Sequence, residues 1–167
     1  MKKYIFILSF LVVGFSSCKK DEVAGGTAVQ DMSGEWWVQV EERVTQPNGD
    51  VTIKTPFGPY YSLSSYNTAD NSSTVMWLDD SQSFYGLKAK VNVDVNNKTF
   101  SATAADELYF EVTVDIKNGQ VIKNGAIGAV SKAVTDSIAF DAVFSDSPKS
   151  LFRYRGYHRT KFPGDDH

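Results

Sequence analysis

The chain has 167 residues, of which 42% are hydrophobic and 22% charged, with a formal net charge of −3. This composition is that of an ordinary folded domain and excludes collagen-like, disordered and multi-span membrane proteins. Removal of the leader described below takes two lysines away, which leaves an excess of acidic residues. A negative balance argues against a protein that binds nucleic-acid phosphates, so we expect no nucleic-acid partner.

The first residues have the layout of a secretory leader. Two lysines precede an apolar run at 4–15, which is too short to span a bilayer as a helix. The run ends in two serines before Cys18, the only cysteine, and this resembles the bacterial lipoprotein signal, in which a peptidase cuts before a cysteine that carries lipid. We therefore expect residues 1–17 to be a signal peptide and Cys18 to be lipidated. The alternative is an unpaired thiol without such a role.

Residues 18–31 have the composition of a flexible tether, because a charged patch is followed by small residues. Lys20 followed by Asp21 and Glu22 resembles the surface-export signal of Bacteroidetes lipoproteins, and an ordinary solvated linker is the alternative. The sequence thus predicts a protein that is anchored to the outer membrane by lipid and exposed at the cell surface.

From Met32 onward apolar and polar residues alternate between turn signals, which predicts antiparallel strands and no long helix. The Asn-Gly pairs at 48–49 and 118–119 each predict a hairpin turn. The expected strands are 34–44, 51–55, 60–66, 74–78, 84–94, 98–102, 108–116, 120–129, 137–144 and 151–159. Because eight to ten strands in an open sheet would expose its edges, we expect an all-β, antiparallel up-and-down barrel over residues 32–162, with 163–167 as a flexible tail. A sandwich is the alternative.

The sequence Gly34-Glu35-Trp36 on the first expected strand resembles the opening motif of the calycins, the lipocalin-type barrels. In that superfamily the tryptophan closes one end of the barrel, and an arginine from the last strand lies over it. The resemblance therefore implies that Trp36 closes this barrel under Arg153, Arg155 or Arg159.

Three further stretches resemble a Bacteroidetes lipoprotein family described as lipid-binding putative hydrolases, and this likeness extends over nearly all of the mature chain. The stretches are Tyr-Asn-Thr-Ala-Asp at 66–70, Met-Trp-Leu-Asp-Asp at 76–80 and Gly-Tyr-His-Arg-Thr-Lys-Phe at 156–162. Such tails more often have glycine where this chain has Lys161. The resemblance implies a lipid ligand and assigns no catalytic residue.

An eight-stranded barrel is just wide enough either to be filled by its own side chains or to hold one small ligand. We expect an apolar pocket that binds a fatty acid or another lipid. The small residues that would leave room for it are Gly125, Ala126, Gly128, Ala129, Ala139 and Ala142. The candidate ligand-binding residues are Tyr61, Trp77, Phe84, Tyr109, Phe140, Tyr154 and His158.

Two alternative functions stay open. In the first, His158 is the catalytic base of a lipid-cleaving hydrolase, although no Gly-x-Ser-x-Gly elbow accompanies it. In the second, the barrel is closed and its outer surface contacts a glycan or a protein of the outer membrane, with an exposed platform made of Tyr60, Tyr61 and Tyr66.

Carboxylates gather at 79–80, 106–107 and 165–166, but their spacing is not that of an EF-hand or of a histidine pair. We therefore interpret them as solvated loop charges and expect neither a metal nor a cofactor.

Overall fold

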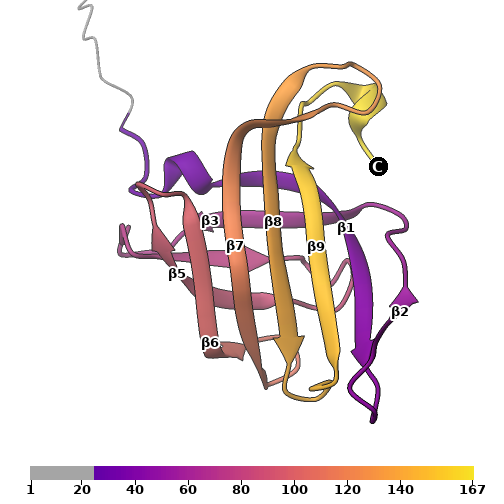
Figure 1. Cartoon of the computed structure of the whole chain (residues 1–167). Helices are drawn as coiled ribbons and strands as arrows, with labels where there is room; N and C mark the ends of the chain where they lie inside the picture. The colour runs from indigo at the N-terminus through magenta and orange to yellow at the C-terminus, as the bar shows by residue number, and fades with distance from the viewer. Residues whose placement is uncertain (1–24) are drawn as a thin grey trace, which may run out of the picture.

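The structure, a computed structural model, describes residues 25–167 (Figure 1). The expected signal peptide 1–17, the lipidation site Cys18 and the first part of the expected tether lie outside the described residues. Within residues 25–167, no helix is long and apolar enough to cross a membrane.

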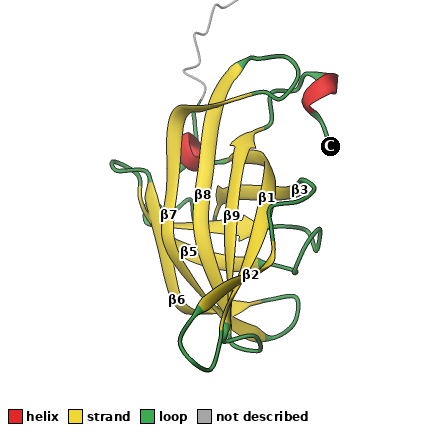
Figure 2. Ribbon diagram, turned by 45° about the vertical axis from the view of Figure 1, so that its right-hand side comes forward, coloured by secondary structure: helices red, strands yellow, loops and turns green. Residues whose placement is uncertain are grey.

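Nine strands and two short 3₁₀ helices make up the described part of the chain (Figure 2). In chain order they are η1 (Gln30–Met32), β1 (Gly34–Thr45), β2 (Val51–Thr55), β3 (Tyr61–Asn67), β4 (Val75–Asp79), β5 (Lys88–Asp94), β6 (Thr99–Glu107), β7 (Val112–Ile127), β8 (Val134–Phe144), β9 (Ser150–His158) and η2 (Pro163–Asp165). Most of the strands coincide with segments that the alternating pattern predicted.

All nine strands belong to one antiparallel sheet, in which consecutive strands pair from β3 to β9. The sheet closes because β1 also pairs with β9, from Trp36 opposite His158 to Val44 opposite Ser150. On its other edge, β1 pairs with β3 through its first residues and with β2 through its last ones. Eight strands therefore form a closed barrel, and β2 is an additional strand beside it, which confirms the predicted up-and-down barrel.

The predicted turn at Asn118-Gly119 is wrong, because these residues lie inside the 16-residue strand β7. The pairing of β7 with β8 shifts between Lys117 and Gln120, and Asn118 has a φ of 55°, so the segment is a β-bulge. A Cβ atom at Gly119 would lie 2.3 Å from the carbonyl oxygen of Phe100 on β6. Asn-Gly supplies the same backbone freedom to a bulge as to a hairpin, which is why the sequence pattern did not separate them.

Both ends of the described chain pack against the barrel. Val29 and Met32 are fully buried, and η1 covers one end of the barrel, so the last residues of the expected tether belong to the folded domain. Residues 163–167, which the sequence predicted as a flexible tail, form η2 and the contacts described below. We call the end with η1 the η1 end (Figures 1 and 2).

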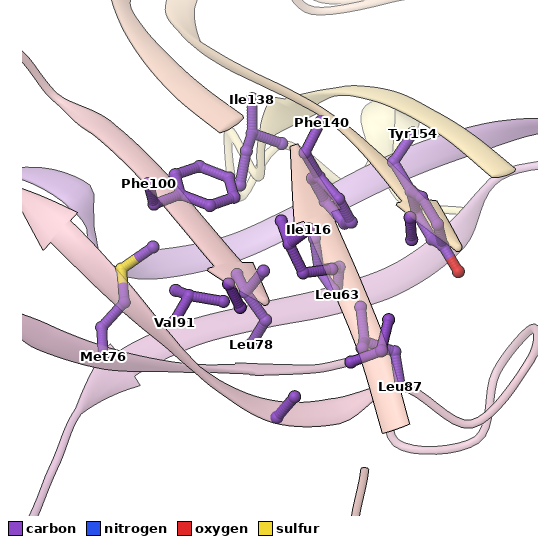
Figure 3. Close-up of a cluster of buried hydrophobic side chains, with 14 of the residues drawn as sticks. Leu63, Met76, Leu78, Leu87, Val91, Phe100, Ile116, Ile138, Phe140 and Tyr154 are labelled. Carbon is purple, nitrogen blue, oxygen red and sulfur yellow. The ribbon is translucent and has the colours of Figure 1, made fainter. Parts of the chain in front are cut away.

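The inward-facing side chains fill the barrel. Leu63, Ile116 and Phe140, which come from different strands, are at most 1% exposed and lie in one cluster (Figure 3). The rings of Phe140 and Tyr154 stack with their centroids 4.4 Å apart. Burial of a side chain of this size contributes roughly 1.5–3 kcal/mol. Because these side chains expose almost no surface, no water-sized space adjoins them.

Candidate functional site

Four of the seven predicted ligand-binding residues point into the barrel or pack against its core: Tyr61, Phe84, Phe140 and Tyr154. The ring of Phe84 lies 4.9 Å from that of Tyr61 and 6.2 Å from that of Tyr154, measured between centroids. These rings occupy the space that an interior ligand would need.

Phe84 comes from the loop between β4 and β5, which closes the end of the barrel opposite η1. The buried carboxylate of Asp80 holds this loop, although the sequence suggested a solvated charge. Four backbone N–H groups donate to it at 2.8–3.3 Å, from Gln82, Tyr85, Gly86 and Leu87. Burial raises the pKa of Asp80, and the N–H donors oppose this shift.

The hydroxyl of Tyr154 is the one buried side-chain polar atom of the described residues that lacks a hydrogen-bond partner. Burial, and after it the charge of Asp80, raises the pKa of Tyr154 well above its ordinary value. An unpartnered buried hydroxyl costs roughly 1–3 kcal/mol. It is therefore the polar group that a ligand inside the barrel would contact.

Trp77 and Tyr109, which were also predicted to line an interior pocket, lie on the outside of the barrel. The ammonium of Lys90 is 5.1 Å from the centroid of the Trp77 ring. The Tyr109 hydroxyl donates to Asp79 at 2.7 Å, and Lys88 forms an ion pair with the same carboxylate at 2.9 Å. Burial and then the hydrogen bond to Asp79 raise the pKa of Tyr109 to about 12. Both aromatic rings are thus part of the outer surface.

The seventh predicted residue, His158, lies at the η1 end and contacts Trp36. The two rings meet edge to face, with centroids 5.1 Å apart. A Cβ atom at Gly34 would lie 2.3 Å from Nε2 of His158, so the glycine of the Gly-x-Trp motif makes room for this imidazole. Trp36 Nε1 donates to Ser65 Oγ at 2.8 Å, and that hydroxyl donates to the Met32 carbonyl at 2.7 Å, which fastens η1 to the barrel.

The resemblance to calycins implied that an arginine covers Trp36. In this structure the His158 imidazole lies against Trp36 instead. Arg153 and Arg155 lie on the outer face of β9, because interior positions on this strand have even numbers. The guanidinium of Arg159 lies over the neighbouring Trp37, 5.7 Å from its ring centroid.

His158 has no catalytic partner among the described residues. Its main-chain carbonyl oxygen accepts a hydrogen bond from the Thr135 hydroxyl at 2.9 Å. Ser65 is engaged on both sides, by the Trp36 indole and by the Met32 carbonyl. A nucleophile and its base usually lie within hydrogen-bond reach, and the described residues do not bring such a pair together at His158.

A groove of about 390 Å³ crosses the outer faces of β7, β8 and β9, and we call it the outer groove. Small residues that lie along it are Gly125, Ala126, Ala139 and Gly156. Larger side chains that lie along it are Ile122, Tyr60 and Tyr157, and polar ones include Gln39, Ser137 and Arg155. Its volume falls in the lower part of the range for small-molecule sites.

The small residues of the outer groove allow the strands to approach closely. A Cβ atom at Gly156 would lie 2.2 Å from the Trp37 carbonyl oxygen, and one at Gly125 would lie 2.4 Å from Ser137 Oγ. The sequence predicted that residues such as Gly125 and Ala139 leave room inside the barrel. They instead leave room on its outside, where they border the groove.

Arg155 supplies a positive charge at the edge of the outer groove. Its Nη1 donates to the Tyr154 carbonyl at 2.7 Å and to the Phe140 carbonyl at 3.3 Å, and its Nη2 is 3.8 Å from Asp141. Partial burial lowers the pKa of Arg155 from its ordinary value, and the guanidinium stays protonated at neutral pH. Burial and then neighbouring groups raise the pKa of Tyr157 to about 12, so that its hydroxyl stays neutral.

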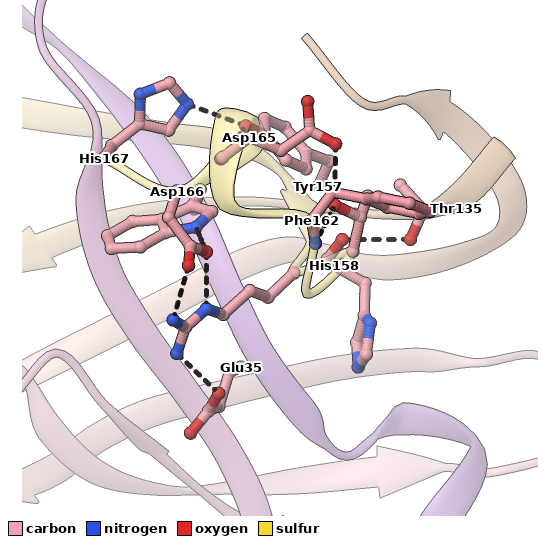
Figure 4. A network of polar contacts seen from close by, with 11 residues as sticks. Glu35, Thr135, Tyr157, His158, Phe162, Asp165, Asp166 and His167 are labelled. Carbon is pink, nitrogen blue, oxygen red and sulfur yellow. Dashed lines mark hydrogen bonds and ion pairs between the residues drawn. The ribbon is translucent and has the colours of Figure 1, made fainter. Parts of the chain in front are cut away.

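The C-terminal residues hold the turn between β7 and β8, beyond the outer groove (Figure 4). The Asp165 carboxylate accepts the backbone N–H groups of Val130 and Ser131 at 2.7 and 2.9 Å, and the Thr160 hydroxyl at 2.6 Å. These hydrogen bonds, with that from the Ser131 hydroxyl the largest cause, lower the pKa of Asp165 below its usual range. We call this set of contacts the Asp165 clasp.

The last residues also contact a wall of the groove. The Tyr157 hydroxyl donates to the Asp165 carbonyl oxygen at 2.9 Å. The His167 ring stacks on that of Tyr60, with their centroids 4.0 Å apart. Asp166 pairs with Arg159 at 2.7 Å. The acidic residues at 165–166 therefore bind protein groups, and the described residues contain no cluster of three metal-ligating side chains.

Residues 21–163 match the protein family described as lipid-binding putative hydrolase. The chain belongs to this family. The match extends from the charged segment near the N-terminus to the first residue of η2, so it includes every strand of the barrel.

Among solved structures, the chain is similar to a structural-genomics protein of unknown function from Bacteroides ovatus. The two are 13% identical with a TM-score of 0.48, and the likeness covers 77% of this chain and 42% of that one. The chain thus spans less than half the length of that protein. No curated protein sequence matches the chain.

The sequence predicted a pocket inside the barrel and did not predict the outer groove. Its small residues Gly125, Ala126 and Ala139 were predicted to leave room inside the barrel, because alternation alone does not say which face of a strand is inward. Arg155 was assigned to closure of the barrel, and Tyr60 to a platform with Tyr61 and Tyr66. In the structure Tyr60 borders the groove, Tyr61 packs against the core, and Tyr66 donates to Asp79 at 2.9 Å.

Proposed function

We propose that this protein is a lipoprotein anchored to the outer membrane through Cys18, with its barrel exposed at the cell surface. In this proposal the barrel binds the acyl chain of a fatty acid or another lipid in the outer groove. The family description supports a lipid ligand, and the lipoprotein signal that ends at Cys18 supports the anchor.

The outer groove is the observation that carries this proposal. Its border of Gly125, Ala126 and Ala139 offers apolar surface, and the rings of Tyr60 and Tyr157, which contact each other edge to face, border the same groove. The guanidinium of Arg155 at its edge can pair with a carboxylate or a phosphate. A mostly apolar groove with one cation at its edge suits an acyl chain that ends in an anionic group. Among the described residues, buried aromatic and aliphatic side chains fill the barrel interior.

The groove is tested by titration of the chain from Lys19 to His167 with a dansyl-labelled fatty acid. This chain retains every strand of the closed sheet. We expect Ala139→Phe, which fills the groove from the outer face of β8, to weaken binding by about tenfold or more, equivalent to about 1.4 kcal/mol. Circular dichroism checks that the variant is folded.

Tyr154→Phe is the matched interior variant, because it removes only the unpartnered hydroxyl inside the barrel. We expect unchanged affinity for the labelled fatty acid, and a free energy of unfolding that is equal to that of the wild type or higher by up to about 1 kcal/mol. Weaker binding by Tyr154→Phe, with Ala139→Phe unaffected, would place the ligand inside the barrel and contradict the groove. If the labelled fatty acid bound neither the wild type nor any variant, this would contradict lipid binding itself.

The anchor is tested separately in cells of a native-type host. Labelled palmitate should be incorporated into the chain and should be lost in Cys18→Ser, and protease added to intact cells should digest the anchored barrel. A wild-type chain that takes up no label would contradict the anchor, without bearing on the outer groove.

A further inference from the structure

Exposed apolar side chains gather where β7 turns into β8. Ile127, Val130, Val134 and Phe162 are between 53% and 66% exposed. Ile127 and Val134 are opposite each other in the ladder, and Val130 lies in the turn between them. Phe162 joins them through Asp165, whose N–H donates to the Phe162 carbonyl and whose carboxylate binds Val130. We call these four residues the apolar tip.

The apolar tip is held in place rather than left as a loose loop. The Asp165 clasp accepts the N–H groups of Val130 and Ser131, and a Cβ atom at Gly128 would lie 2.3 Å from Oδ2 of Asp165. The Asp165 carboxylate therefore fixes the backbone of the turn, while the large apolar side chains of the turn are exposed to solvent. Contiguous exposed apolar groups of this kind mark interaction surfaces.

Two exposed lysines flank the apolar tip, although the whole chain has an excess of acidic residues. From Gln120 to Thr135 the sequence contains Lys123 and Lys132 and no acidic residue. Lys132 and Lys161 are exposed beside the tip. Of the carboxylates in this region, Asp136 pairs with Lys123 at 2.9 Å, and Asp165 accepts the hydrogen bonds of the clasp and is buried.

The described chain starts at the same end of the barrel as the tip (Figure 1). Asp31 of η1 lies 3.9 Å from Lys123 on β7, which places the N-terminal segment beside the strand that leads to the tip. The seven residues from Cys18 to Ala24 can span at most about 25 Å when fully extended. A lipid on Cys18 therefore keeps this end of the barrel close to the bilayer.

We propose that the apolar tip inserts into the interface of the lipid bilayer, with Lys132 and Lys161 near anionic headgroups. Apolar side chains with flanking lysines are the combination that binds such interfaces. Ala126, which borders the outer groove, immediately precedes Ile127 of the tip on β7, so one end of the groove lies next to the docked tip. This inference rests on the proposed function for the anchor and for the groove, but the tip can be tested without either.

The test uses the unlipidated chain from Lys19 to His167 and flotation with two kinds of vesicle, one of phosphatidylcholine and one that also contains phosphatidylglycerol. The tip variant is Ile127→Ser, Val130→Ser and Val134→Ser combined. The matched control is Val51→Ser, Ile53→Ser and Leu108→Ser combined, which removes side chains that are 52–61% exposed and lie away from the η1 end. Thermal melting verifies that both variants fold.

We expect the wild type and the control to float with the anionic vesicles, and the tip variant to bind on the order of 100-fold more weakly. Lys132→Glu combined with Lys161→Glu should lower binding to the anionic vesicles and leave binding to the phosphatidylcholine vesicles nearly unchanged.

Equal binding by the tip variant and the control, or no binding by the wild type, would overturn the proposal. A wild-type dimer in sedimentation equilibrium that dissociates in the tip variant would instead assign the tip to a second copy of the chain. Failure of the labelled fatty acid to bind would concern the groove alone.

Discussion

Single glycines determine how closely neighbouring groups approach in this barrel. Gly34 leaves space for the His158 imidazole, and Gly156 allows β9 to approach the Trp37 carbonyl. At both positions the φ angle is ordinary, so the missing Cβ atom, and not backbone freedom, is what the structure uses. The Gly-x-Trp motif thus has a steric explanation here, in which Trp36 and His158 close the η1 end together.

Gly34→Ala should destabilise the protein by about 1–3 kcal/mol, because the new methyl group displaces His158 from Trp36. Chemical denaturation measures the change. In a His158→Ala background the same substitution should cost much less, since the clash is gone. Gly58→Ala is the control, because the nearest atom to its Cβ lies 3.8 Å away, and we expect a change within about 0.5 kcal/mol. Additive effects of Gly34→Ala and His158→Ala would contradict this explanation.

At the scale of residues, the sequence pattern puts Phe152, Tyr154 and His158 on one face of β9 without deciding which face is inward, and in the structure this face is the inward one. It did not predict which loop acids are structural. Glu107 is buried and accepts the N–H groups of Lys88, Tyr109 and Phe110 at 2.8–3.0 Å. These donors come from a distant strand and a local turn, and only the closed sheet brings them together.

Among the elements, the turn between β7 and β8 depends most on a distant segment. Its N–H groups have their acceptor in Asp165, more than 30 residues away in the sequence. The predicted hairpin at Asn118-Gly119 became a bulge, and the actual turn at 128–133 has no Asn-Gly or Asp-Gly pair. Local turn chemistry could therefore predict the number of strands approximately, but not that the expected strands 108–116 and 120–129 belong to one strand, β7.

Asp165→Asn should lower the melting temperature at neutral pH, because the clasp loses a charged acceptor. The pKa of Asp165 is lowered in the folded state, so its contribution to stability is complete above the unfolded value of about 3.9 and declines as the pH falls towards the folded value. The difference between wild type and Asp165→Asn should therefore be constant from pH 5 to 7 and shrink below pH 4. Thermal melting followed by circular dichroism checks this. A difference that persists unchanged at low pH would contradict the assigned role.

For the molecule as a whole, alternation and turn signals were sufficient to predict an up-and-down barrel. They were not sufficient to place a ligand, because a shift of one residue reverses the face of a strand. Trp77 and Phe140 were both predicted to line an interior pocket. Trp77 lies on the outside of the barrel, and Phe140 points inward but is part of the packed core. Whether a barrel of this size is hollow depends on how all its strands pack together, which no single segment reveals.

In the proposed function, the barrel is filled, and the outer groove and the apolar tip both contact lipid on the outside of the protein. The η1 end carries the tip and the start of the described chain, and the groove extends along β7 from that end. In this account the barrel is a rigid support, and its outer face is the functional surface.

The most direct test of this account is to photo-crosslink a diazirine-bearing palmitic acid to the chain from Lys19 to His167 and to locate the adducts by mass spectrometry. We predict adducts on residues of the outer groove, such as Ile122, Ala126 and Tyr157, and their loss in Ala139→Phe. Adducts on the interior residues Phe84 and Tyr154 would contradict the account, because they would show that the barrel opens and holds its ligand inside.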